Sequence, residues 1–185
     1  GINWTVRATD LNTAGERVAW NGLVWVAVGS STDSVIYSYD GIIWNDGNRP
    51  FSTSGHGVAW NGIMWVAVGN DVSNTISYSG DGIIWTDVGD DLFTGIGYGI
   101  VWNGTMWIAM GQGGNSIGYS YNGLNWIGLG TSIFSTLGRG VACNVKSSSQ
   151  IIFPTNRMVY VSSTTSIKYS PNGIDWTDLG NPLTF

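Results

Sequence analysis

The sequence repeats itself at a period of about 41 residues, and this repeat restricts the fold more than any other feature. The segment at 18–29, VAWNGLVWVAVG, returns at 58–69 and at 100–111, and a degraded copy begins at 141–144 and resumes at 157–161. A second segment ends at a tryptophan in each copy, and these tryptophans are Trp44, Trp85, Trp126 and Trp176, at intervals of 41, 41 and 50 residues. Such a period, with turn signals inside it, is typical of four-stranded units that stack around an axis.

Both ends of the chain depart from the regular repeat. The nine extra residues of the last interval fall in the segment around 146–156. Trp4 lies 40 residues before Trp44, so residues 1–5 are predicted to be the last strand of an earlier repeat. The sequence therefore predicts four full units and one surplus N-terminal strand.

The turn signals predict the strands within each unit. Asn-Gly between apolar runs is a strong hairpin signal, and it occurs in each of the first three repeats, at Asn21, Asn61 and Asn103. With a two-residue loop at 21–22, Trp20 would pair with Leu23 and Val18 with Trp25. Alternation along the strands then makes both faces of the hairpin apolar, and such a sheet must be covered on both faces.

These signals define the expected boundaries. In the first unit we expect strands at about 16–20, 23–29, 34–39 and 42–46. The whole chain, 1–185, is predicted to be one domain, with the end of a preceding repeat and a linker at 1–15. Its four blades are expected at 16–55, 56–97, 98–138 and 139–185. Tight turns would lie on one side of the blades, and the longer, polar, variable connections on the other.

Composition excludes several kinds of partner and location. The chain has 28 glycines and 11 tryptophans, only 10% charged residues and a net charge of −5. Phosphate backbones are bound by clustered Lys and Arg, so nucleic acid is not an expected partner. No apolar run approaches the ~18 residues of a membrane helix, so membrane insertion is not expected. The single cysteine, Cys143, forms no internal disulfide.

The segments at 38–44, SYDGIIW, and at 79–85, SGDGIIW, resemble the Asp-box (BNR-like) repeat, in a form that lacks one residue between Asp and Gly. The resemblance implies an all-β fold, a β-propeller of four-stranded antiparallel blades, as in sialidase-like and photosystem-assembly-like propellers. Asp-box repeats also occur in secreted and viral proteins, which favours an extracellular or virion-associated location.

Most repeated residues are expected to have structural roles. Asp and Asn before Gly hydrogen-bond the backbone of their own turn, and two copies of the motif exchange Asp for Asn. We therefore assign turn formation, without metal or cofactor, to Asp40, Asp81, Asn122, Asn172, Asn21, Asn61 and Asn103. The tryptophans at fixed register are predicted to be core residues: Trp20, Trp25, Trp44, Trp60, Trp65, Trp85, Trp102, Trp107, Trp126 and Trp176. Cys143 occupies the register of Trp20 and is predicted to be a small core residue.

An enzymatic function is poorly supported by the residues. The resemblance raises sialidase activity, whose sites use an arginine triad, a tyrosine–glutamate pair and an acidic aspartate. This chain has one glutamate, Glu16, and five arginines without a matching motif. Its close carboxylate pairs are loop aspartates such as Asp90 and Asp91, and His56 has no serine or cysteine motif beside it. We expect no catalytic residue, with a glycoside hydrolase fragment as a distant alternative.

One register differs between repeats while its neighbours stay constant. The residue two positions before each Val-Ala-Trp equivalent is Glu16, His56, Tyr98 or Arg139. We expect these residues near the axis on the variable side, as a ligand-binding site on a fixed scaffold. The alternative is that an exposed loop position has diverged without a role. The expected partner is a glycan or a protein. A structural unit that forms a homo-oligomer or part of a larger ring is the second functional hypothesis.

Overall fold

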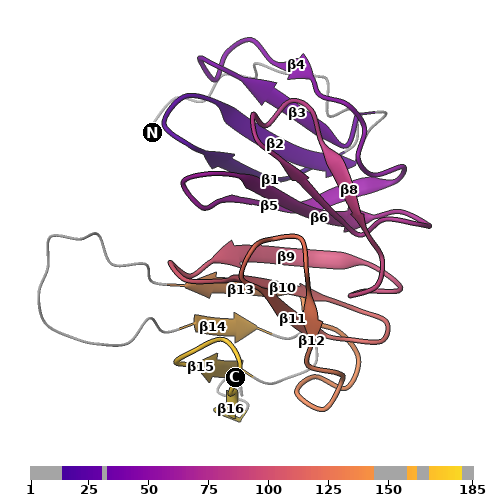
Figure 1. Cartoon of the computed structure of the whole chain (residues 1–185), viewed down its shortest axis with the longest axis vertical. Helices are drawn as coiled ribbons and strands as arrows, with labels where there is room; N and C mark the ends of the chain where they lie inside the picture. The colour runs from indigo at the N-terminus through magenta and orange to yellow at the C-terminus, as the bar shows by residue number, and fades with distance from the viewer. Residues whose placement is uncertain (1–13, 31–32, 144–157, 162–166, 181–185) are drawn as a thin grey trace, which may run out of the picture.

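The computed structural model describes residues 14–30, 33–143, 158–161 and 167–180, which form sixteen strands and no helix. They build four blades in chain order (Figure 1). Blade 1 has β1 (Ala14–Trp20), β2 (Trp25–Ser30), β3 (Val35–Ser38) and β4 (Asn45–Asp46). Blade 2 has β5 (Ser54–Trp60), β6 (Trp65–Asn70), β7 (Ile76–Ser79) and β8 (Thr86–Gly89). Blade 3 has β9 (Gly97–Trp102), β10 (Trp107–Gly111), β11 (Ile117–Ser120) and β12 (Ile127–Gly128). Blade 4 has β13 (Gly140–Cys143), β14 (Met158–Val161), β15 (Ile167–Ser170) and β16 (Thr177–Asp178).

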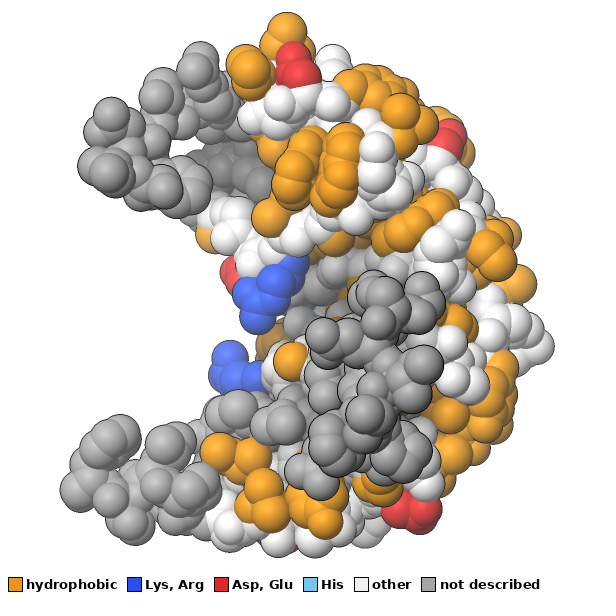
Figure 2. Space-filling model, turned by 90° about the vertical axis from the view of Figure 1, so that its left-hand side faces the viewer, with side chains coloured by type: hydrophobic (Ala, Val, Ile, Leu, Met, Phe, Trp, Pro, Cys, Tyr) orange, Lys and Arg blue, Asp and Glu red, His pale blue; other side chains and the backbone are white. Residues whose placement is uncertain are grey.

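Within each blade, every strand pairs antiparallel with the next strand along the chain. Blades 3 and 4 are separate four-stranded sheets, whereas the antiparallel pairing of Ser30 in β2 with Ser54 in β5 also links blades 1 and 2. The body is C-shaped around an open hollow (Figure 2). The predicted surplus strand at 1–5 and the extra segment around 146–156 lie outside the described residues.

The first hairpin turn differs from the prediction. Trp20 lies opposite Trp25, not opposite Leu23, so the loop has four residues, 21–24. The side chain of Asn21 causes this, because its Oδ1 accepts the amide hydrogens of Leu23 and Val24 at 2.8 and 2.7 Å. Those amides are then not available to a two-residue turn. The register shifts by two positions, which leaves the assignment of side chains to the two strand faces unchanged.

The outer strand is also shorter than predicted, because the second turn takes residues from it. β4 begins at Asn45, whereas a strand was expected from residue 42. The carboxylate of Asp40 accepts the amide hydrogens of Ile42 and Ile43 at 2.8 and 2.9 Å. An amide that is bonded to its own turn cannot donate to a neighbouring strand.

The core lies between the blades. Three clusters of buried side chains fill the gaps between blades 1 and 2, 2 and 3, and 3 and 4. Each cluster includes one phenylalanine from the loop that connects successive blades: Phe51, Phe93 or Phe134. These loops were predicted to be polar and variable. Each loop nevertheless carries a phenylalanine at about the same place in the repeat, because the loop crosses the gap between blades, where an apolar side chain is shielded from water.

The tryptophans differ in how deeply they are buried. Trp65, Trp85 and Trp107 are buried, as predicted for core residues. Trp25, Trp44, Trp60, Trp102, Trp126 and Trp176 are half-buried. The prediction is wrong for Trp20, which is 41% exposed, because it lies on the face of blade 1 that no described blade covers. Cys143 is half-buried against the third cluster, and its thiol donates to the carbonyl oxygen of Trp102 at 3.2 Å.

Candidate functional site

The four residues at the variable register come together in one cleft. Glu16 lies in β1, His56 in β5 and Tyr98 in β9, and Arg139 directly precedes β13. With Arg17 they line a cleft of about 220 Å³. The reason is the repeat itself: the innermost strands of successive blades lie side by side, so equivalent positions become neighbours in space. We call these four residues the axial column.

Members of the axial column contact each other from blade to blade. The rings of His56 and Tyr98 have their centroids 5.6 Å apart, and Cζ of Arg139 lies 5.4 Å from the centroid of Tyr98. The Tyr98 hydroxyl donates to Oε1 of Gln112 at 3.2 Å. Each contact joins adjacent blades or fixes a ring, so the column has a defined geometry and not the freedom of an exposed loop.

Burial and neighbouring charges determine the protonation state of His56. Burial lowers the pKa of His56, the positive charge of Arg17 lowers it further, and the negative charge of Glu16 opposes this shift. The imidazole is therefore neutral at neutral pH, with one ring nitrogen as donor and the other as acceptor. Nε2 of His56 lies 3.0 Å from Oγ of Ser54.

This serine–histidine contact was not expected from the sequence. Ser54 is 4% exposed, so its hydroxyl is enclosed beneath the imidazole and does not face the cleft as a nucleophile would. The contact orients the ring of His56. It gives the cleft a fixed hydrogen-bonding group without an exposed reactive oxygen.

Arg17 is a cleft residue that was not predicted from the sequence. Its Nη1 donates to the carbonyl oxygen of Glu16 at 2.7 Å, and the side chain lines the cleft. The signal was present, because the position after the axial column is Gly57, Gly99 or Gly140 in the other blades and arginine only here. A break in a repeated glycine thus marks a functional candidate as clearly as the varied register does.

The Ser-x-Asp-Gly and Ser-x-Asn-Gly turns have the geometry of self-contained backbone turns. Oδ1 of Asp81 accepts from the Ser79 hydroxyl and from the amides of Ile83 and Ile84, at 2.8 to 2.9 Å. Asn122 makes the equivalent three contacts with Ser120, Leu124 and Asn125, at 2.9 to 3.1 Å. In the described part of the chain, no three His, Cys, Asp or Glu side chains are grouped as metal ligands are.

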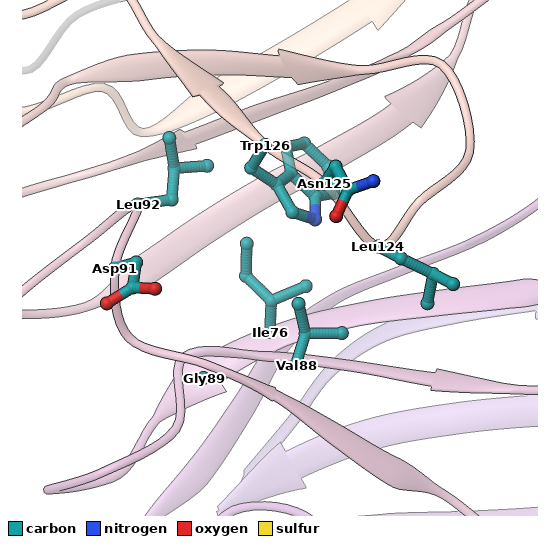
Figure 3. Close-up of a pocket in the computed structure, with 8 residues that line it drawn as sticks. All are labelled: Ile76, Val88, Gly89, Asp91, Leu92, Leu124, Asn125 and Trp126. Atoms are coloured by element: carbon teal, nitrogen blue, oxygen red, sulfur yellow. The ribbon is translucent and has the colours of Figure 1, made fainter.

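A second depression lies between the outer parts of blades 2 and 3 and measures about 240 Å³. Figure 3 shows Trp126 and Asn125 of blade 3 facing Ile76 and Val88 of blade 2. At the equivalent place between blades 1 and 2, Asn48 fills the space and forms two hydrogen bonds with the backbone of Trp85, at 2.6 and 2.9 Å. Gly89 stands at that register in blade 2, so the depression follows from a missing side chain.

Comparison with known proteins supports the architecture. Neither protein-family models nor curated proteins give a match to the chain. A computationally designed protein, Ika8, is similar in structure, with a TM-score of 0.61 and 12% identity over 89% of this chain and 48% of the designed one. YCF48 from Cyanidioschyzon merolae is similar with a TM-score of 0.64 and 16% identity over 92% of this chain and 57% of YCF48.

Both structures are propellers, which confirms the predicted fold: the chain is an all-β propeller of four-stranded antiparallel blades. It spans about half the length of these two structures. No helix long and apolar enough to cross a membrane occurs in the residues described.

Proposed function

We propose that this chain is a non-catalytic recognition module, built from Asp-box-like repeats, which binds a glycan or a protein segment in the cleft of the axial column. One observation carries the proposal. The four residues that differ between otherwise similar repeats, Glu16, His56, Tyr98 and Arg139, line one cleft together with Arg17. A constant scaffold that holds a varied set of polar side chains is how many recognition surfaces are built.

The chemistry of the cleft indicates the class of ligand. Arg17 and Arg139 supply guanidinium donors, which bind carboxylates in pairs of hydrogen bonds. Glu16 supplies an acceptor for hydroxyl or amide hydrogens, and neutral His56 offers Nδ1 to the ligand, because Nε2 contacts the Ser54 hydroxyl. A ligand that carries both a carboxylate and hydroxyl or amide groups fits this set. An acidic glycan and an acidic peptide segment both have these groups.

The size of the cleft limits what it holds. Sites for drug-sized ligands measure about 300–1,000 Å³, whereas this cleft measures about 220 Å³. It therefore accommodates one sugar unit or one side chain of a larger ligand. The non-catalytic assignment is supported by the Asp/Asn exchange in the turns and by the enclosed hydroxyl of Ser54.

The test is binding of the labelled protein to an array of neutral and carboxylate-bearing glycans and to an array of acidic peptides. We expect one array to give signals that depend on the carboxylate, and Tyr98→Ala to reduce them at least about tenfold, because it removes the ring that contacts both His56 and Arg139. Tyr121→Ala is the matched control, since Tyr121 is 59% exposed and lies outside the cleft. Equal binding by a folded Tyr98→Ala variant would place the site elsewhere.

A further inference from the structure

Blade 1 exposes side chains that are buried or half-buried at the same register in the other blades. Val58 is 8% exposed and Ile100 is 6% exposed, and each packs into the core cluster that it shares with the preceding blade. The equivalent residue of blade 1, Val18, is 56% exposed, beside the exposed Trp20. Val18 and Trp20 therefore present the same surface that packs against a preceding blade elsewhere, but no described residue covers them.

Blade 4 shows the complementary feature on its opposite face. A Cβ atom at Gly99 would lie 3.1 Å from the carbonyl oxygen of Arg139, and one at Gly57 would lie 3.2 Å from the amide nitrogen of Ile100. Glycine thus fits the close approach of the next blade at this register in blades 2 and 3, whereas blade 1 has Arg17 there, which lines the cleft. Gly140 repeats this glycine in blade 4, yet nothing lies within 4 Å of its Cβ position. Beside Gly140 there is therefore space for a further blade, and no described residue fills this space.

The charges of the axial column are also compatible with a further blade next to Gly140. Adjacent members interact across each interior junction: Glu16 with His56, His56 with Tyr98, and Tyr98 with Arg139. The column thus begins with an acid in blade 1 and ends with a base in blade 4. If blade 4 of one copy is followed by blade 1 of another, Arg139 meets Glu16 of the second copy, with Arg17 beside it.

We propose that two copies of this chain close head to tail into one ring of eight blades, in which the exposed face of blade 1 covers Gly140 of the other copy. The two junctions between the copies are identical under two-fold symmetry. Because the ring closes, no blade face remains without a neighbouring blade. The length comparison favours two copies, because the chain covers 48% of the designed propeller that it resembles. The two copies would bring two axial columns together, with Glu16 and Arg139 paired at both junctions.

The first test measures the mass in solution by light scattering coupled to size exclusion. We expect about 40 kDa, twice the 19.8 kDa of one chain. Gly140→Leu should give a folded protein of half that mass, because the added side chain has space within one copy and blocks the junction. Gly80→Leu is the matched control, since the Cβ position of Gly80 is also free within 4 Å and lies in a turn away from the junction; it should stay dimeric.

The second test exchanges charges and does not depend on packing. Glu16→Arg would place a base opposite Arg139 at both junctions, and Arg139→Glu would place an acid opposite Glu16, with Arg17 unchanged beside each pair. Each variant alone should therefore dimerise at least about tenfold more weakly. A mixture of the two variants restores an acid and a base at both junctions. We expect the mixture to form a heterodimer of wild-type mass. Asp91→Arg, a reversal in the exposed loop between blades 2 and 3, should have no effect.

The outcomes separate this inference from the proposed ligand site. A wild-type monomer, a larger or polydisperse assembly, or a dimer that neither Gly140→Leu nor the charge variants weaken would overturn it. The same holds for a mixture that remains monomeric. Tyr98→Ala lies inside the column and not at the junction, so loss of glycan or peptide binding in a dimeric Tyr98→Ala variant concerns the ligand site alone.

Discussion

The Ser-x-Asp-Gly turn of blade 2, at 79–82, allows a sharp test of whether the carboxylate of Asp81 is structural. Asp81→Ala removes three hydrogen bonds to Oδ1, from the Ser79 hydroxyl and the amides of Ile83 and Ile84. Each such bond contributes about 0.5–1.5 kcal/mol, and the lower part of this range applies because water reaches the freed amides. We expect a loss of about 1–2 kcal/mol in the free energy of unfolding. Asp81→Asn should cost less than about 0.5 kcal/mol, since Asn122 makes the same three contacts.

The assay is urea unfolding followed by tryptophan fluorescence. With a slope of about 2 kcal/mol per molar urea, Asp81→Ala should lower the midpoint by about 0.5–1 M, and Asp81→Asn should leave it nearly unchanged. If Asp81→Asn destabilises the protein as much as Asp81→Ala, the negative charge itself is required. That result would refute the assignment of a turn that needs only the side-chain oxygen, and would point to a bound cation.

The pH dependence gives a second check on the same turn. Partial burial acts to raise the pKa of Asp81, but the amide hydrogen bonds of Ile84 and Ile83 outweigh it, so the pKa lies below its ordinary value of 3.8. A carboxyl group with a lowered pKa in the folded state stabilises the protein above its unfolded pKa, and this contribution is lost as the pH falls through the folded value. Asp81→Asn has no such group. We therefore expect the variant to gain relative to the wild type below about pH 4.

Three further predictions concern the blade contacts and the cleft. Gly99→Val should destabilise the fold by about 1–3 kcal/mol, because its side chain meets the carbonyl oxygen of Arg139; Gly80→Val is the control, and equal urea midpoints would contradict the close approach. Burial lowers the pKa of His56, so its contribution to stability is present above about pH 6.5 and falls as the pH drops below it. His56→Gln should lose less stability than the wild type between pH 7.5 and 5.5, and parallel losses would contradict this. Burial raises the pKa of Cys143, so the folded protein should react with iodoacetamide at pH 8 at least about tenfold more slowly than the urea-unfolded chain, as followed by mass spectrometry.

The repeat made the architecture predictable, because the order of strands and the side-chain faces follow from periodicity alone. The turn details were less accessible. That Asn21 and Asp40 bind the amides two and three residues ahead is a property of side-chain geometry, and it shifted the register and shortened the outer strand. The side chains stayed on their predicted faces of the strands because the register shifted by two residues, an even number.

The candidate site was predictable in membership but not in contacts. Equivalent positions of stacked blades become neighbours, so Glu16, His56, Tyr98 and Arg139 could be grouped from the alignment of repeats. The stacking order, the enclosure of Ser54 and the contribution of Arg17 depend on the distance between blades, which periodicity does not contain. The exposure of Trp20 depends on whether another blade covers blade 1, and the repeat gives every tryptophan at that register the same environment.

The placement of the core between blades, and not within them, has a consequence for how the protein opens. A blade here is stabilised by its neighbours, so stability passes along the chain as nearest-neighbour coupling, and a terminal blade has half the coupling of an interior one. In a single copy, such as the Gly140→Leu variant, amide hydrogen exchange should then be slowest in β6 and β10, and faster toward blades 1 and 4. A closed ring has no ends, and in it this gradient would vanish.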